Sequence, residues 1–218
     1  MNFRAVIFDW RGTLVTTLTW SDWARHALHA VGRDSSDEQV RALVAALRSV
    51  DGIEDRLDCP GIDADADVHR QIYFEVFNDA GLDDDLARAL YEVESDPSFN
   101  HFAQDAEATL RELQRRGIRV ALASDIHFDV RPAFAAAGLS GLVDVFTLSF
   151  EHGVQKPDPL MFTWTLQALG CEPAETLMVG DRPGPDGAAV LQGITTLLLP
   201  PLADERHQRL HHVLAVAR

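Results

Sequence analysis

Lysine is almost missing from this chain of 218 residues. The chain has 19 basic residues, and all except Lys156 are arginine. A general bias toward arginine replaces lysine wherever the two serve equally well, but a compact ammonium and a planar guanidinium fork are not interchangeable. Lys156 lies in the segment GVQKPDP, directly before a predicted helix start. Its retention there indicates a loop that faces a ligand.

Cysteine and long apolar runs are also scarce. Cys59 and Cys171 are far apart and lack the spacing of a metal site, which argues against a disulfide framework and favours reduced thiols in a cytoplasmic protein. The N-terminal segment has neither the apolar region nor the cleavage site of a signal peptide. No stretch reaches the ~18 apolar residues that a bilayer span requires. We therefore expect no membrane partner.

Positive charge is outweighed by negative charge. The formal net charge is -15 and the sequence pI is about 4.8. Nucleic acids and anionic membranes attract the opposite sign, so neither is expected as a partner. The same acidity repels phosphorylated molecules at long range. A phosphate site in this chain would therefore need local cations, dipoles or a metal ion.

Apolar segments of strand type alternate with amphipathic helical segments over most of the chain. This alternation predicts an α/β fold with a doubly wound, parallel, Rossmann-like sheet. The predicted strands are residues 4–8, 118–123, 143–149, 176–179 and 195–199, and the predicted helices between them are residues 105–116, 132–137, 157–169 and 186–191.

A block of helical patterns interrupts this alternation after the first strand. Four such patterns occur between residues 21 and 95, with no convincing strand among them. Residues 51–67 contain many carboxylates, Gly and Pro, and are predicted to be a solvated loop. The sequence therefore predicts an all-helical cap at residues 16–99, inserted into a core made of residues 1–15 and 100–218.

The first strand runs directly into the turn Asp9-Trp10-Arg11-Gly12-Thr13. A carboxylate at the carboxyl end of a buried parallel strand lies where open α/β sheets bind ligands, and it can act as a nucleophile or a metal ligand. Gly12 permits close backbone approach, and the Thr13 hydroxyl with nearby N–H groups can donate to an anion. Taken alone, the same pattern also fits a strand that ends in an Asx turn.

Polar residues follow three further predicted strands in the same way. Ser124 ends the second strand, Lys156 lies in the loop after the third, and Asp181 and Asp186 follow the fourth. A hydroxyl and an ammonium can hold phosphate oxygens, while Asp9, Asp181 and Asp186 can hold a Mg²⁺ ion. These cationic components supply what the acidic surface lacks.

These four segments resemble the motifs of the haloacid dehalogenase-like hydrolase superfamily, and the helical cap after the first motif resembles its insertion. The motifs are DWRGT at 9–13, SD at 124–125, KPDP at 156–159 and GDRPGPD at 180–186. The resemblance implies that Asp9 is a nucleophile and that Ser124 and Lys156 orient the transferring group. It also implies a metal site at Asp9, Asp181, Asp186 and the Arg11 backbone carbonyl. Gly12, Thr13 and Asp125 complete the predicted substrate-binding residues.

Arg11 departs from the phosphatase pattern, which has a second Asp as general acid and base at this position. Arginine keeps its proton and cannot accept one from water. Loss of a positioned acid and base typically lowers the rate by ~10²- to 10⁴-fold. The resemblance therefore predicts a slow phosphatase that acts on a small phosphorylated molecule through an aspartyl-phosphate on Asp9.

Two alternatives remain from the sequence. In a metal-independent 2-haloacid dehalogenase, Arg11 or the cap residue Arg41 would stabilise the departing halide. In a pseudo-phosphatase, Arg11 would pair with Asp9 or Asp181, displace Mg²⁺ and leave a protein that binds a phosphorylated ligand or a protein partner. A phosphonoacetaldehyde hydrolase, suggested by the Asp-Trp-x-Gly-Thr pattern, needs a cap lysine that this chain lacks.

A few other side chains are candidates for the site. His127 follows the second motif and could replace the missing acid or base, although such a residue more often only begins the next helix. Trp10, Trp20 and Trp23 lie near the predicted site entrance in sequence. They could line a substrate pocket, but packing between cap and core is the more common use of such residues.

Overall fold

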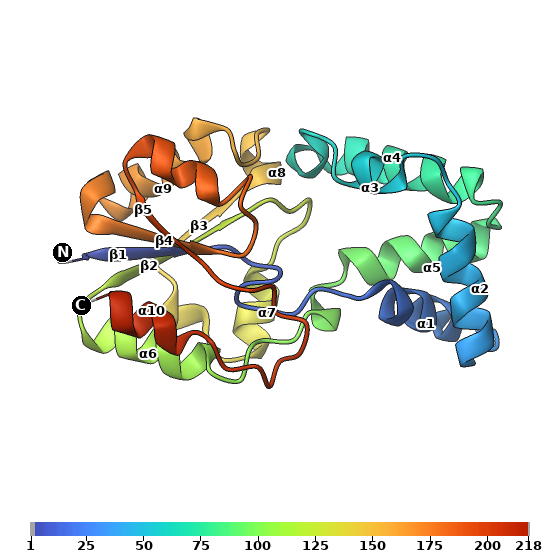
Figure 1. Ribbon diagram of the computed structural model, residues 1–218, viewed down its shortest axis with the longest axis horizontal. Coiled ribbons are helices and arrows are strands. Elements are labelled where there is room, and N and C mark those ends of the chain that lie inside the picture. Colours follow the sequence, from blue (N-terminus) through green and yellow to red (C-terminus); the bar gives the residue numbers. More distant parts are fainter. Residues whose placement is uncertain (1–2, 218) are drawn as a thin grey trace.

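A five-stranded parallel sheet forms the centre of the core in a computed structural model that describes residues 3–217 (Figure 1). The strand order is β3-β2-β1-β4-β5, and every neighbouring pair is parallel. The predicted doubly wound sheet is therefore confirmed. The strands are β1 (Ala5–Phe8), β2 (Arg119–Ser124), β3 (Val145–Leu148), β4 (Thr176–Gly180) and β5 (Thr195–Leu198).

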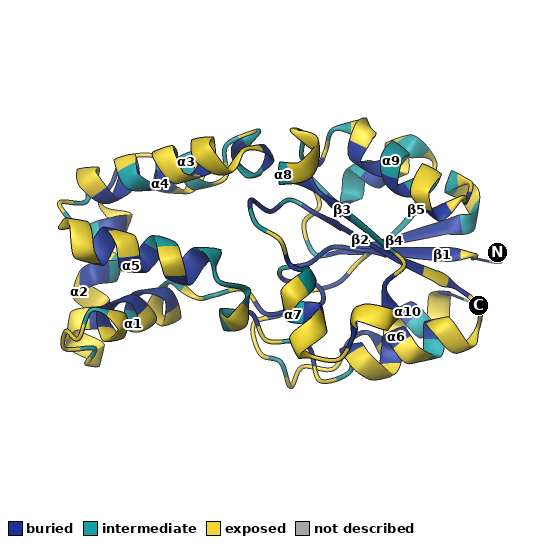
Figure 2. Cartoon of the chain, turned by 180° about the vertical axis from the view of Figure 1, so that it is seen from behind, coloured by how far each residue is buried: buried dark blue, intermediate teal, exposed yellow. Residues whose placement is uncertain are grey.

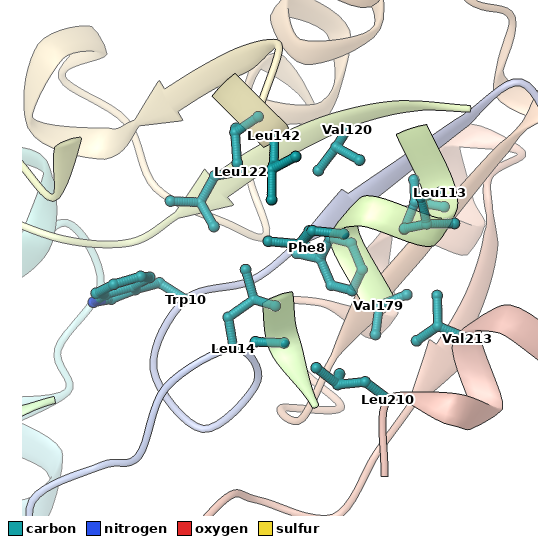
Figure 3. Close-up of a cluster of buried hydrophobic side chains, with 14 of the residues drawn as sticks. Phe8, Trp10, Leu14, Leu113, Val120, Leu122, Leu142, Val179, Leu210 and Val213 are labelled. Atoms are coloured by element: carbon teal, nitrogen blue, oxygen red, sulfur yellow. The ribbon is translucent and has the colours of Figure 1, made fainter. Parts of the chain in front are cut away.

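Helices cover both faces of this sheet because the strands are apolar on both sides. Val6 and Phe8 of β1 belong to one buried cluster, whereas Ala5 and Ile7 belong to another on the opposite face. The first face packs against α6 (Ala106–Arg115), α7 (Arg131–Ala136) and α10 (His211–Val216). Figure 3 shows Phe8 at the centre of this cluster. The second face packs against α9 (Pro159–Leu169).

The cap is a separate helical layer with its own apolar core (Figures 1 and 2). Buried side chains such as Trp23, Leu47, Phe77 and Leu90 form this core, and none of them belongs to the clusters of the sheet. The predicted helical insertion is thus present, while its exact bounds at residues 16 and 99 stay a prediction. Its helices are α1 (Trp20–Ala30), α2 (Asp37–Arg48), α3 (Ile53–Leu57), α4 (Ala66–Asp79) and α5 (Asp84–Ser95).

The prediction of a loop at residues 51–67 is wrong in part. This segment contains the five-residue helix α3 and the 3₁₀ helix η1 (Ile62–Ala64). Ile53 and Ile62 are buried in the cap core, so tertiary packing holds turns that are too short to be stable alone. Other 3₁₀ turns are η2 (Pro97–Phe99), η3 (Ser140–Leu142), η4 (Pro173–Glu175) and η5 (Gly187–Gln192), and a short helix α8 (Ser149–His152) follows β3.

The carboxyl ends of the strands face the cap (Figure 1). Asp9 follows β1, Ser124 ends β2 and Asp181 follows β4, so the loops that carry them meet at this edge. Lys156 lies beyond α8 in the loop that leads into α9. None of the helices within residues 3–217 combines the length and apolarity that a membrane span requires.

Candidate active site

Four charged side chains meet at the carboxyl edge of the sheet, and we refer to Asp9, Lys156, Asp181 and Asp186 as the Asp9 cluster. The Lys156 ammonium lies 2.6 Å from Asp9 Oδ1 and 2.6 Å from Asp186 Oδ1. Carboxylate oxygens of Asp9, Asp181 and Asp186 lie within 4.8 Å of one another. Three such oxygens around one point match the donor set that Mg²⁺ prefers. The structure therefore brings together residues that the sequence predicted from three distant segments.

Two glycines allow these carboxylates to approach the backbone. Gly12 has a φ of +77°, and a Cβ at this position would lie 2.4 Å from Asp181 Oδ2. A Cβ on Gly180 would lie 2.2 Å from Asp186 Oδ2. Any larger residue at either position would push the carboxylate away. The turn after β1 and the end of β4 thus require glycine for the geometry of the cluster.

Hydrogen bonds fix the loops that carry the cluster. Asp186 Oδ2 accepts from the backbone N–H groups of Asp181 and Arg182, at 3.1 and 2.9 Å. The Thr13 hydroxyl donates to Asp181 Oδ1 at 3.2 Å. Asp125 accepts a 2.8 Å bond from the backbone N–H of Lys156, so its carboxylate holds the lysine loop.

Burial and charge oppose each other in the cluster. Burial raises the pKa of Asp9 to about 7, although the Lys156 ammonium acts against this rise. Burial alone would lower the pKa of Lys156, but attraction to Asp9 and Asp186 raises it above its ordinary value. The lysine therefore stays charged, and it favours the ionised form of the Asp9 carboxyl. A bound divalent cation would favour that form further.

The Arg11 side chain turns away from the Asp9 cluster toward the cap. Its guanidinium forms an ion pair with the Glu94 carboxylate and also donates to the Glu94 backbone carbonyl. Its Nε donates to Asn100 Oδ1 at 3.3 Å. Although burial alone would lower it, the pKa of Arg11 is raised by Glu94. Arg11 thus links the first strand end to α5 of the cap.

A cavity of about 210 Å³ lies between the core and the cap. Its core side includes Asp9, Ser124, Asp125, Lys156 and Asp181, and its cap side includes Leu57, Asp58, Asp63, Tyr73 and Glu94. A second cavity of about 260 Å³ shares Arg11, Thr17, Leu57, Tyr73 and Glu94 with the first and adds Leu18, Trp20 and Trp23. The polar site therefore adjoins an apolar space within the cap.

The three tryptophans that the sequence singles out, Trp10, Trp20 and Trp23, have two different roles. Trp10 is fully buried and packs against Phe102 and Phe134 of the core. Trp20 and Trp23 line the second cavity, where their rings lie 5.7 Å apart between centroids. Packing therefore explains Trp10, whereas the two cap tryptophans are also available to a ligand.

Sequence reasoning missed the cap side of the site. Asp63, Tyr73 and Glu94 line the cavity, but they lie on three different cap elements with no motif spacing. His127, which the sequence singled out, is buried and forms a 2.9 Å hydrogen bond with Ser95. It is not among the residues that line the 210 Å³ cavity. Only the folded cap reveals these neighbours.

Known proteins share both the sequence pattern and the fold. A family profile described as haloacid dehalogenase-like hydrolase matches residues 3–192. A phosphoserine phosphatase from Thermus thermophilus is 34% identical over 137 residues, which cover 60% of this chain and 55% of that protein. The match thus spans about half the length of that relative.

Solved structures of two kinds have the same fold. A HAD phosphatase from Thermococcus onnurineus superposes with a TM-score of 0.62 at 21% identity, over 98% of this chain and 97% of that one. A 2-haloacid dehalogenase from Pseudomonas syringae superposes with a TM-score of 0.63 at 22% identity, over 99% of this chain and 100% of the other. At these identities, the comparison supports the fold alone.

Proposed function

Because the chain belongs to the family of haloacid dehalogenase-like hydrolases, we propose that it is a slow phosphatase that acts on a small phosphorylated molecule through Asp9. The observation that carries this proposal is the Asp9 cluster, in which one buried ammonium lies between two carboxylates beside a third. This set of charges suits a phosphoryl group and a divalent cation together.

In the proposed reaction, a carboxylate oxygen of Asp9 attacks phosphorus while the bond from phosphorus to the leaving oxygen breaks. Phosphoryl transfer relies mainly on positioning and on neutralisation of charge. Lys156 supplies a fixed positive charge at this point, and the Ser124 hydroxyl can donate to a phosphoryl oxygen. A Mg²⁺ ion held by Asp9, Asp181, Asp186 and the Arg11 carbonyl would neutralise further charge on the phosphoryl oxygens.

Arg11 determines which step is slow. Its guanidinium is held by Glu94 and keeps its proton, so it neither protonates a leaving group nor activates water. A leaving group that departs as a stable anion needs no acid. We therefore infer that formation of the Asp9 phosphoaspartate is feasible, whereas its hydrolysis is the impaired step.

The apolar cavity supports a substrate class. It adjoins the polar site, and its additional residues are Leu18, Trp20 and Trp23. A leaving group with a flat, apolar part would bury its surface against these side chains. We propose an aryl or similarly apolar phosphomonoester as the preferred substrate, and an aryl phosphate as the probe.

The test follows phosphate release and protein mass after addition of Mg²⁺ and an aryl phosphate. We expect a burst of phenol, slow steady release of phosphate, and a phosphoryl adduct that Asp9→Asn lacks. The double variant R11D/E94Q should hydrolyse the substrate about 100-fold faster, since it restores a carboxyl group without placing it opposite Glu94. Absence of both phosphate release and the adduct would overturn the proposal.

The two alternatives have less support. A dehalogenase would need Arg11 or Arg41 as a halide site. Arg41 is exposed on α2 and is not among the residues that line either cavity, and Arg11 lines both cavities but is already paired with the Glu94 carboxylate. A pseudo-phosphatase would have Arg11 within the Asp9 cluster, but its ion pair among the described residues is with Glu94. Chloride release from 2-chloropropionate in the presence of a chelator would favour the dehalogenase instead.

A further inference from the structure

A second group of buried polar side chains lies at the boundary between cap and core. We refer to Asp63, His69, Glu94 and His127 as the His69 cluster. Asp63 lies on η1, His69 on α4 and Glu94 on α5, whereas His127 follows β2 in the core. The side chains of His69, His127 and Glu94 are only 2%, 3% and 10% exposed, and that of Asp63 is 21% exposed. Asp63 and Glu94 line the 210 Å³ cavity, and the cavity lining does not include the two imidazoles.

The donor atoms of this cluster converge on Asp63. Asp63 Oδ1 is 3.8 Å from His69 Nε2 and 3.8 Å from His127 Nδ1. Glu94 Oε2 is 3.8 Å from the same His69 Nε2 and 3.3 Å from His127 Nε2, the other nitrogen of that ring. The 3.8 Å separations are too long for hydrogen bonds, which have N···O distances of about 2.7–3.2 Å. One donor atom each of Asp63, His69 and His127 lies within 4.8 Å of the other two, whereas Glu94 lies beside this group of three.

Each imidazole has its other nitrogen occupied. His69 Nδ1 is 3.3 Å from the Tyr91 hydroxyl, and His127 Nε2 is 2.9 Å from the Ser95 hydroxyl. If these nitrogens carry the ring protons, His69 Nε2 and His127 Nδ1 each direct a lone pair toward the cluster. This arrangement is typical of histidine ligands, whose second nitrogen donates to a neighbouring group and fixes the tautomer.

The cluster has acceptors and negative charge in excess. Glu94 Oε2 and His127 Nδ1 are buried and have no hydrogen-bond partner. Asp63 and Glu94 bring two carboxylates, whereas among residues 3–217 their ion pair with a permanent cation is that of Glu94 with Arg11. Buried acceptors of this kind are costly unless a proton or a metal ion satisfies them. A divalent cation would satisfy Asp63 and the two imidazole nitrogens at once, while Glu94 adds negative charge beside them.

We propose that Asp63, His69 and His127 bind one divalent transition-metal ion of the Zn²⁺ type, separate from the cation site of the Asp9 cluster. Two imidazoles and one carboxylate form a donor set that suits such ions better than Mg²⁺. Bonds of ~2.0–2.2 Å place tetrahedral donors roughly 3.3–3.6 Å apart. The observed 3.8 Å separations of Asp63 Oδ1 from the two imidazole nitrogens are only slightly larger.

Binding would change the packing of the two rings. His69 and His127 now stack with centroids 3.4 Å apart and an interplanar angle of 16°. The lone pairs of stacked rings lie in nearly parallel planes, so the rings must tilt before the lone pairs converge on one ion. Since two ligands come from the cap and one from the core, the ion would fasten the cap in its closed position over the cavity.

The experiment titrates chelator-treated protein with Co²⁺, which reports its coordination through visible absorption. Excess Mg²⁺ is kept present to saturate the Asp9 cluster. We expect one Co²⁺ per chain, with the intense bands of a tetrahedral site. In H69Q/H127Q the affinity should fall by more than the ~10- to 100-fold that loss of an outer-shell partner causes. Asp181→Asn should leave this affinity unchanged, and H152Q, a histidine outside the cluster, serves as the matched control.

Several outcomes would overturn the proposal. These are an absence of stoichiometric Co²⁺ in the wild type, unchanged affinity in H69Q/H127Q, or loss of the site in Asp181→Asn. X-ray absorption spectroscopy of the wild type loaded with Zn²⁺ keeps the test independent of variant folding, because two imidazole ligands give a distinct scattering pattern. A spectrum without imidazole would mean that the two rings only pack against each other.

Discussion

Arg11 follows Asp9 by two residues and pairs with Glu94 of the His69 cluster, and the Asp9 and His69 clusters satisfy their buried charge in different ways. In the Asp9 cluster, the Lys156 ammonium lies between two carboxylates. In the His69 cluster, by contrast, Glu94 Oε2 and His127 Nδ1 have no hydrogen-bond partner. Most side chains of both clusters are buried, so the difference is that the Asp9 cluster contains an ammonium, rather than exposure to water.

The two clusters also differ in what assembles them. The Asp9 cluster is built entirely from loops at one edge of the sheet, so it needs only the core to form. The His69 cluster takes three side chains from the cap and one from the core, and it exists only while the cap is closed. A ligand of the second cluster would therefore act on closure, whereas a ligand of the first would not.

The largest expected effect follows from removal of the ammonium that satisfies the Asp9 cluster. Lys156→Met leaves the buried carboxylates of Asp9 and Asp186 without their partner. Breaking a buried pair in this way costs about 3–5 kcal/mol of the free energy of unfolding. Urea denaturation of the variant and of the wild type measures this loss.

Mg²⁺ provides the control for this variant. A cation that binds the native state at 100 times its Kd adds about 2.7 kcal/mol of stability. Without the competing ammonium, Lys156→Met should gain more from Mg²⁺ than the wild type does. If Lys156→Met and the wild type were equally stable when both are measured without Mg²⁺, the two clusters would not differ in their need for a cation.

A smaller effect is expected at the ion pair that joins the two clusters. Arg11→Gln removes the partner of Glu94, whose side chain is only 10% exposed, while Arg11 itself is 26% exposed. We expect R11Q to cost about 2 kcal/mol and E94Q a similar amount, since each leaves one charge unpaired. The double variant R11Q/E94Q should cost 1 to 3 kcal/mol less than the sum, as about this coupling is typical of contacting residues.

Urea denaturation of the four proteins completes this double-mutant cycle. Tryptophan fluorescence follows both layers, because Trp20 and Trp23 lie in the cap and Trp10 and Trp164 lie in the core. If the cost of R11Q/E94Q in the free energy of unfolding equalled the sum of the two single costs, a direct interaction between Arg11 and Glu94 would be contradicted. Arg11 would then have to be assigned to the Asp9 cluster after all.

The Asp9 cluster could be predicted from the sequence because the fold itself brings its members together. Each of its residues follows a strand, and parallel strands end at the same edge of a sheet. The direction of the Arg11 side chain could not be predicted, since Glu94 lies 83 residues further along the chain. Its position depends on cap closure, which no local pattern encodes.

The His69 cluster was missed for a related reason. Asp63 falls within the segment expected to be a solvated loop, where short turns show no hydrophobic period. His127 was noticed only as a neighbour of Ser124, and nothing in the spacing linked it to His69. Residues from two layers meet here only through tertiary packing, so the sequence alone could not place them together.

The smallest effect is expected at an exposed ion pair that spans the same boundary as Arg11 and Glu94. Arg182 donates to both carboxylate oxygens of Asp58, at 2.7 and 2.6 Å, and so joins the core to the cap at the cavity. The two side chains are 45% and 57% exposed. Water and salt screen such pairs, so Asp58→Asn should cost less than ~1 kcal/mol, and less still at high ionic strength. Urea denaturation at low and high NaCl measures both quantities. This pair and the Arg11 pair both connect cap and core, and they differ chiefly in burial. If D58N lowered the free energy of unfolding as much as R11Q does, burial would not determine how strongly a charged side chain holds the cap closed.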